Sequence, residues 1–263
     1  MIEVVVDSIR ASLTNHQRVV ILKTKTGERY LPVWIGPAEA DAIAIKLQRV
    51  AVPRPMTHDL LNSVIAALGA VIDFIVICDL RQDIFYARIH LGFGGGPLPI
   101  KVEFPPESES AGPQTAQKAD QSEVKGPGLS FMWRGRYYQA VQLREWREGG
   151  NRFVEVRGED GTLLEIRHDE ILNDWSIIRV KIDSRPSDAI ALAVRTQAPI
   201  YVEEVVLNKA GFTMDQESGK PVAWGLEASK GKALSEEEMR GLAAFRDFIE
   251  NLDLEDFGKG KRK

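Results

Sequence analysis

The stretch SRPSDAIALAV, residues 184–194, repeats a pattern that first occurs in GPAEADAIAIKL, residues 36–47. In each stretch an acidic residue comes two positions after a proline, and the run DAIAL or DAIAI begins at or after that acidic residue. Proline is favoured at the first helical position, and a carboxylate in the first turn complements the positive end of the helix dipole. Both stretches therefore predict helix N-termini, and the repeat predicts that the two helix starts contribute to one site.

A third helix start follows Pro55, where Thr57 has the residue type of an N-cap and Asp59 lies in the first turn. Strand-like runs surround the three helix starts, and RQD at residues 81–83 predicts a short hairpin connection. Helix N-termini bind anions through free backbone N–H groups and the helix dipole. If these helix starts converge, they can hold a phosphate.

The composition excludes several classes of protein. The 263 residues carry a formal net charge of -4, so contact with nucleic acid requires a local basic patch rather than a basic surface overall. No apolar run reaches the length of a membrane span and no signal-peptide pattern opens the chain, which predicts a cytoplasmic protein. The single cysteine, Cys78, lies in an apolar run and excludes a cysteine-based zinc site.

The chain divides into four expected regions. We expect an α+β domain with a mixed or antiparallel sheet and packed helices, formed discontinuously by residues 1–95 and 179–208. Residues 96–128 have a linker composition, and residues 129–178 contain five short strand-like runs that predict an inserted, small β-barrel-like module. Residues 209–263 predict a loop, an amphipathic C-terminal helix with a capping box, and a basic tail.

Three long blocks of the sequence resemble the bifunctional nuclease domain family: RYLPVWIGPAEADAIAI, VPRPMTHDLLNSVIAALGA and IDSRPSDAIALAVRTQAPIYV. The resemblance covers about residues 1–92 and 179–207 and leaves out the inserted module and most of the C-terminal region. It implies an α+β domain, a homo-oligomer, and the DNase and RNase activity known for some members. Nucleic acid is therefore the expected partner, and a membrane is not.

Phosphodiester hydrolysis requires an activated nucleophile, a site for the phosphate and stabilisation of the leaving oxygen. The residues around the helix starts supply candidates for each role. His58, Asp59 and Asp188 are the catalytic candidates, with His58 as the acid and base. Arg54, Arg185 and Ser187 are the phosphate-binding candidates. Asp183 and Glu39 are candidate ligands for a divalent metal such as Mg²⁺ or Mn²⁺.

Each assignment has a structural alternative. First-turn carboxylates and Ser or Thr residues are ordinary helix caps, and the arginines before the prolines can pair with those carboxylates. The aromatic and arginine residues of 133–153 suit either the core of a small barrel or the stacking of single-stranded nucleic acid. Two functions therefore stay open: a nuclease, and a non-catalytic regulatory protein that binds a nucleotide, a nucleic acid or a protein through an anion pocket.

Overall fold

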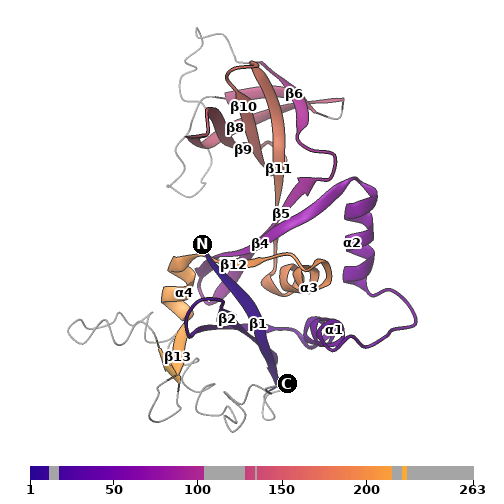
Figure 1. Ribbon diagram of the computed structural model, residues 1–263, viewed down its shortest axis with the longest axis vertical. Helices are drawn as coiled ribbons and strands as arrows, with labels where there is room; N and C mark the ends of the chain where they lie inside the picture. Colours follow the sequence, from indigo (N-terminus) through magenta and orange to yellow (C-terminus); the bar gives the residue numbers. More distant parts are fainter. Residues whose placement is uncertain (12–17, 104–127, 134, 215–220, 224–263) are drawn as a thin grey trace, which may run out of the picture. The chain divides into compact units, whose positions relative to one another are not determined.

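The computed structural model describes residues 1–11, 18–103, 128–133, 135–214 and 221–223 (Figure 1). The chain forms two compact units. The first unit contains residues 1–62, 74–88 and the chain from residue 183 onward, and the second contains residues 63–73 and 89–182. The expected C-terminal helix with Ser235 and Glu238 lies outside the described residues.

The described residues form four helices and fourteen strands. The helices are α1 (Pro37–Leu47), α2 (Thr57–Ala67), α3 (Pro186–Thr196) and α4 (Glu204–Ala210). The strands are β1 (Ile2–Ala11), β2 (Arg18–Thr24), β3 (Arg29–Ile35), β4 (Ala70–Arg81), β5 (Ile84–Phe93), β6 (Leu98–Glu103), β7 (Gly128–Trp133), β8 (Arg136–Glu148), β9 (Asn151–Gly158), β10 (Leu163–Asp169), β11 (Asp174–Ser184), β12 (Ile200–Val202), β13 (Phe212–Met214) and β14 (Pro221–Ala223).

The first unit is built on a sheet in which β4, β12, β1, β2, β3, β13 and β14 lie side by side in that order. The short strand β12 pairs in parallel with β4, through Ile200 opposite Ile75, and the other neighbours whose register is known are antiparallel. The central strands β2 and β3 are apolar on both faces, because both faces are covered.

Helices α1 and α3 pack against each other, and they also contact β2 and β3 respectively. Their sequences suit this close packing, because small alanines occupy the buried positions. Helix α3 is almost wholly buried from Pro186 to Ala193, whereas α1 buries only Ala40, Ala42 and Ile43. The starts of two helices that are distant in sequence are thereby held within one layer of the first unit.

The second unit contains a closed, six-stranded antiparallel barrel. Its strands run in the order β10, β9, β8, β7, β6 and β11, and β10 pairs with β11 to close the ring. Alternate residues point inward and form one apolar core that includes Phe131, Val154, Ile166, Trp175 and Ile177. The barrel therefore has its own hydrophobic core, separate from that of the first unit.

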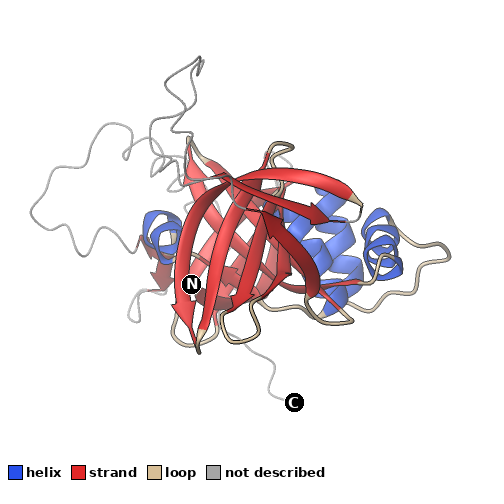
Figure 2. Ribbon diagram, turned by 90° about the horizontal axis from the view of Figure 1, so that it is seen from above, coloured by secondary structure: helices blue, strands red, loops and turns tan. Residues whose placement is uncertain are grey.

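The expected fold class, an α+β sheet with packed helices, is wrong. Strands account for 56% of the structure and helices for 22%, so the protein is mostly β (Figure 2). Strands such as β4 and β8, with 12 and 13 residues, outweigh four short helices. Strand β6 lies within residues 96–128, where the sequence predicted a linker, and its pairing with the distant β11 is not visible in any local pattern.

Candidate functional site

The repeated sequence pattern forms the first turns of α1 and α3. Gly36 and Arg185 are the N-cap residues, each with an extended backbone and no hydrogen bond from a capping side chain. Each is followed by a proline at the first helical position, and Glu39 and Asp188 lie in the two first turns. The N-cap position that usually holds Ser, Thr, Asp or Asn is thus occupied by glycine and arginine, and the arginine side chain is available for other contacts.

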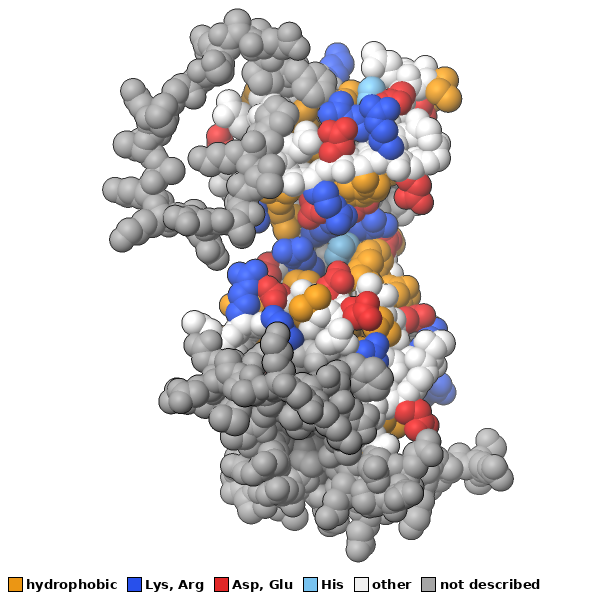
Figure 3. Space-filling view, turned by 90° about the vertical axis from the view of Figure 1, so that its left-hand side faces the viewer, with side chains coloured by type: hydrophobic (Ala, Val, Ile, Leu, Met, Phe, Trp, Pro, Cys, Tyr) orange, Lys and Arg blue, Asp and Glu red, His pale blue; other side chains and the backbone are white. Residues whose placement is uncertain are grey.

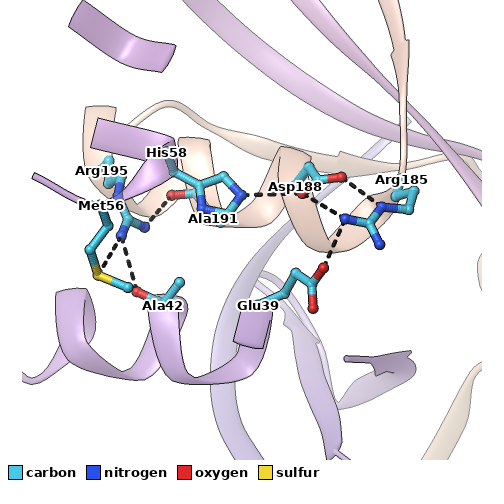
Figure 4. Close-up of polar contacts among 8 residues, drawn as sticks. All are labelled: Glu39, Ala42, Met56, His58, Arg185, Asp188, Ala191 and Arg195. Carbon is cyan, nitrogen blue, oxygen red and sulfur yellow. Dashed lines mark hydrogen bonds and ion pairs between the residues drawn. The ribbon is translucent and has the colours of Figure 1, made fainter. Parts of the chain in front are cut away.

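Arg185 joins the two helix starts (Figure 4). Its Nε donates to Asp188 Oδ2 at 2.8 Å, and one terminal nitrogen, NH2, donates to Glu39 Oε1 at 2.8 Å and to Asp188 Oδ1 at 3.2 Å. The other terminal nitrogen, NH1, has no partner within the described ranges, and 67% of the side chain is exposed. Two carboxylates therefore fix the side chain of Arg185, and the two N–H groups of its other terminal nitrogen face solvent.

His58, the second residue of α2, completes the arrangement. Its Nε2 lies 3.2 Å from Asp188 Oδ1, and only 8% of the residue is exposed. A carboxylate oxygen only accepts, so in the neutral ring Nε2 carries the proton and Nδ1 keeps the lone pair. We call Glu39, His58, Arg185 and Asp188 the helix-start cluster.

The electrostatics of the helix-start cluster centre on Asp188. Burial acts to raise its pKa, but the hydrogen bonds from Arg185 and His58 outweigh burial and hold the pKa of Asp188 below its usual range. The same contacts raise the pKa of Arg185, with the bond to Asp188 as the largest cause and the bond to Glu39 next. Asp188 is therefore ionised at neutral pH and orients His58 as a carboxylate.

Asp59 has a different environment from the one that its catalytic candidacy requires. Its Oδ2 accepts a hydrogen bond from the backbone N–H of Met56 at 2.9 Å, and its Oδ1 accepts one from Arg195 Nε at 2.8 Å. Burial acts to raise the pKa of Asp59, yet these bonds lower it overall. Asp59 thus caps the start of α2 and pairs with an arginine, which agrees with the capping alternative for this residue.

Arg195 is the member of this region that the sequence did not reveal. It lies in the last turn of α3 with only 3% of its side chain exposed, and it also donates to the carbonyl oxygens of Ala191 and Ala42 at 2.9 and 3.3 Å. Its position in a last helical turn suits the dipole, so no local signal marked it as a contact for α2. Through these hydrogen bonds Arg195 connects α1, α2 and α3 next to the helix-start cluster (Figure 4).

The structure does not bring the remaining candidates into the cluster. Arg54 is exposed in the loop before α2, and Asp183 is exposed near the end of β11. Ser187 is 6% exposed at the second position of α3, with its side chain in the buried layer. None of the three has a hydrogen bond or ion pair with a cluster residue within the described ranges.

The expected metal site requires oxygen or nitrogen ligands that converge. Among the residues that the structure describes, no three His, Cys, Asp or Glu side chains lie close enough to hold an ion. Glu39 Oε1 and both oxygens of Asp188 already accept hydrogen bonds from Arg185 or His58. The described residues therefore do not form a ready Mg²⁺ or Mn²⁺ site, and the chemistry below is assigned to side chains alone.

Two further observations delimit the site. A hollow of about 370 Å³ in the first unit is lined by residues of β1, β2 and α1, including Arg10, Arg18 and Asp41, and it contains no candidate residue.

Elsewhere, positive and negative side chains lie side by side on the face in Figure 3, as the small net charge leads one to expect. No helix of the described ranges is long and apolar enough to cross a membrane.

Comparison with known proteins gives the family. A family model described as the bifunctional nuclease domain matches residues 20–104 and 164–215, which include all four cluster residues and Arg195. Two uncharacterized proteins of Mycobacterium tuberculosis, from the Oshkosh strain and a second strain, are each 28% identical to the chain over 255 residues. Each alignment covers 97% of both proteins. Because the model matches more than half of the chain, this protein belongs to the bifunctional nuclease domain family.

Proposed function

We propose that the protein hydrolyses phosphodiester bonds of DNA or RNA at the helix-start cluster. The observation that carries the proposal is the chain of contacts from His58 to Asp188 to Arg185, which leaves one guanidinium nitrogen exposed. An oriented histidine beside a positive group that can bind phosphate supplies two of the three requirements for hydrolysis. Membership of the family supports the same class of reaction.

In this proposal His58 is the general base and then the general acid. Its Nε2–H donates to Asp188, so Nδ1 takes a proton from an attacking water and returns it to the leaving oxygen. Asp188 fixes the tautomer and stabilises the imidazolium that forms, as a carboxylate does in other oriented histidine sites. Asp59 and Arg195 are positioning residues that hold the first turn of α2, which carries His58.

Arg185 binds the phosphate in this proposal. Its free nitrogen offers two N–H donors to non-bridging phosphate oxygens, and its exposure leaves room for a polynucleotide backbone. Glu39 and Asp188 prevent the guanidinium from turning away, but their two negative charges also oppose an anion nearby. Arg54, Asp183 and Ser187 have no role that the described contacts support.

The test is a cleavage assay on single-stranded DNA and RNA, run with Mg²⁺, with Mn²⁺ and with a chelator. His58→Ala should lower the rate by about 10²- to 10⁴-fold, the usual contribution of a general acid or base. Comparison of the reactions with Mg²⁺, with Mn²⁺ and with a chelator shows whether a divalent ion increases the cleavage rate. Cleavage that continues unchanged in His58→Ala would assign the activity to a contaminant or to another part of the protein.

Arg81 supplies a matched control for Arg185. Its Nε also pairs with an aspartate, Asp79, at 2.5 Å, and its side chain is 66% exposed against 67% for Arg185. Arg185→Ala should slow cleavage and weaken oligonucleotide binding, whereas Arg81→Ala removes the same charge and should leave both unchanged. Equal losses in the two variants would indicate a general effect of charge rather than a site.

The second candidate function is binding without hydrolysis. It is favoured by the same contacts, because Asp188 is fully engaged and an anion needs only the free nitrogen of Arg185. In that case the wild-type protein binds oligonucleotides or nucleotides, binds them more weakly in Arg185→Ala, and shows no cleavage with any metal. The assay above therefore separates the two functions.

We further propose that the protein is a homo-oligomer with α2 in the contact. Four large apolar residues of α2 and its C-terminal end are exposed, and the helix bears no charged side chain after Asp59. These residues are Leu60, Leu61, Val64 and Leu68. An exposed apolar stripe without charge marks an interaction surface, and a second copy of the same stripe is complementary to it across a two-fold axis.

A further inference from the structure

The barrel carries a row of side chains on its outer surface that the helix-start cluster does not use. Trp146 of β8 lies opposite Phe153 of β9, Phe153 opposite Arg167 of β10, and Arg167 opposite Ser176 of β11. Directly opposite residues of neighbouring strands point to the same face. We call Trp146, Phe153, Arg167 and Ser176 the outer row.

The register shows that the outer row points away from the core. The neighbouring residues along the three strands β9, β10 and β11, namely Val154, Ile166 and Ile177, belong to the inward core of the barrel. Successive side chains of a strand point to opposite faces, so Phe153, Arg167 and Ser176 point outward. Neither Trp146 nor Phe153 is part of that core, and both are partly exposed. Core packing therefore does not account for these two aromatic residues.

The aromatic end of the outer row is a pair of rings stacked on each other, which we call the platform. The rings of Trp146 and Phe153 are stacked, with centroids 5.5 Å apart and planes at 10°. The guanidinium of Arg144 lies 4.6 Å from the centroid of Trp146, and its side chain is 66% exposed. Partly exposed aromatic rings and arginine side chains are the groups against which proteins stack the bases of single strands.

The polar end of the outer row contains two groups without partners. The side chain of Arg167 makes no hydrogen bond or ion pair with any residue in the described ranges, and its Nε is shielded from solvent. Ser176 is only 4% exposed, and its hydroxyl also has no partner there. Because Arg167 Nε and Ser176 Oγ are shielded from solvent, an incoming anion would meet the terminal nitrogens of Arg167, whose side chain is partly exposed.

The acidic residues on this face are engaged elsewhere. Glu155 pairs with Lys181 at 3.3 Å and weakly with Arg144 at 3.8 Å, and Glu165 pairs with Arg179 at 3.2 Å and Lys181 at 3.4 Å. No carboxylate therefore neutralises Arg167 within the described ranges. The charge of Arg167 is thus available to an anion beside two partly exposed aromatic rings.

We propose that the outer row binds single-stranded nucleic acid, with bases against Trp146 and Phe153 and a backbone phosphate on Arg167. Bases of a duplex are stacked on each other and cannot reach such a platform, whereas unpaired bases can. Trp146, Phe153 and Arg167 lie on three neighbouring strands, β8, β9 and β10, and this spread favours a strand over a mononucleotide. Trp146 and Phe153 lie outside the residues matched by the family model.

This binding does not depend on phosphodiester cleavage, so the two proposals can fail separately. The experiment uses the full chain with His58→Ala, which blocks the proposed reaction and leaves the barrel unchanged. Fluorescence anisotropy with labelled single-stranded DNA and RNA of about fifteen nucleotides, near the upper site size of a small barrel, measures the affinity. The quenching of tryptophan fluorescence by unlabelled strands reports contact with Trp146.

Three substitutions test the outer row. Trp146→Leu, Phe153→Leu and Arg167→Gln should each weaken binding of the strand by about tenfold, whereas Phe153→Tyr keeps the ring and should retain it. Arg147→Gln is the matched control, because Arg147 is the next residue of β8, points to the other face and is 66% exposed in a pair with Glu170. A melting curve for each variant shows that the fold is retained.

Three results would overturn the proposal. The first is unchanged affinity in the outer-row variants. The second is an equal loss in Arg147→Gln, which would assign the binding to charge alone. The third is competition by a duplex or by a mononucleotide that matches the single strand at equal phosphate concentration.

Discussion

Arg195, buried in the last turn of α3, donates a hydrogen bond of 2.8 Å to Asp59 in the first turn of α2. The same guanidinium donates to the carbonyl oxygens of Ala191 and Ala42. One side chain of α3 therefore joins this helix to α1 and α2, which lie far from it in the sequence. The helix start that carries His58 depends on this junction for its place beside Asp188.

Arg195→Ala should lower the free energy of unfolding by about 2–4 kcal/mol, because it removes several hydrogen bonds of a buried charged group and leaves carbonyl oxygens unpaired. Urea denaturation measures the change. The exposed pair of Arg81 supplies the comparison, since Arg81→Ala should cost about 1 kcal/mol or less. A loss for Arg195→Ala no larger than that of Arg81→Ala would contradict the role of Arg195 as the junction.

The local features of this region could be predicted from the sequence, and the junction could not. Prolines 37 and 186 and Thr57 mark the starts of α1, α3 and α2, because helix-start chemistry depends on adjacent residues. Arg195 and Asp59 are 136 positions apart, and an arginine in a last helical turn is already explained by the dipole. Contacts between distant residues leave no local pattern.

The fold class depends in the same way on contacts between distant residues. The hydrophobic patterns revealed strands, but the closed barrel depends on pairings of β11 with both β6 and β10. Strand β6 is distant from β11 in the sequence, and it lies in a stretch that has the composition of a linker. A helix-start pattern is local and does not show how much of the chain is helical, and helices account for only 22% of the structure.

Stability should depend on pH through Asp188. The pKa of this carboxyl is lower in the folded protein than its ordinary value of about 3.8, so its contribution is present above that value and is lost as the pH falls through the folded pKa. Asp188→Asn removes the contribution at every pH. The difference in unfolding free energy between wild type and Asp188→Asn should therefore be largest at pH 5–7, roughly, and shrink below about pH 3.

Urea denaturation at a series of pH values gives this difference directly. Asp160→Asn is a control in a turn of the second unit, since its carboxyl also has a lowered pKa but makes no contact with Arg185 or His58 in the described ranges. A difference between wild type and Asp188→Asn that stays constant with pH would show that the ion pairs of Asp188 contribute nothing to folding.

Glu39 should oppose anion binding while it holds Arg185. Glu39→Gln removes one of two negative charges beside the guanidinium, and one unit charge at about 4 Å is worth about 1 kcal/mol in water, so phosphate affinity should rise by about fivefold. Gly36→Ala should act in the same direction, because a Cβ at Gly36 would collide with Glu39 Oε2 and displace the carboxylate. The backbone of Gly36 is extended with φ -67°, so alanine fits there without strain.

Titration of both variants with a short oligonucleotide at low and moderate salt measures the affinity. Both should bind more tightly than wild type at low salt, and the gain should shrink at higher salt because the charges are screened. Arg185→Ala should shift the affinity in the opposite direction. Weaker binding in Glu39→Gln would mean that Glu39 contacts the ligand or positions Arg185 more than it repels the anion.

The apolar stripe of α2 should hold copies of the protein together. Leu60→Glu and Val64→Glu place a charge at positions that are 61% and 45% exposed in the single chain, so neither should disturb the protomer's own core. Each should nevertheless break an interface that buries the stripe, because an unpaired charge is costly in an apolar contact. Light scattering coupled to size-exclusion chromatography at tens of micromolar, roughly, gives the mass of each variant.

The control substitution is Ile171→Glu, at a residue that is 89% exposed in the turn between β10 and β11 and is not part of α2. We expect an oligomeric mass for wild type and Ile171→Glu, and the mass of one chain for Leu60→Glu and Val64→Glu. An oligomer that survives both α2 substitutions would place the interface on another surface. A wild-type protein that is a monomer at these concentrations would remove the proposed oligomer, and the exposed stripe would then require a different partner.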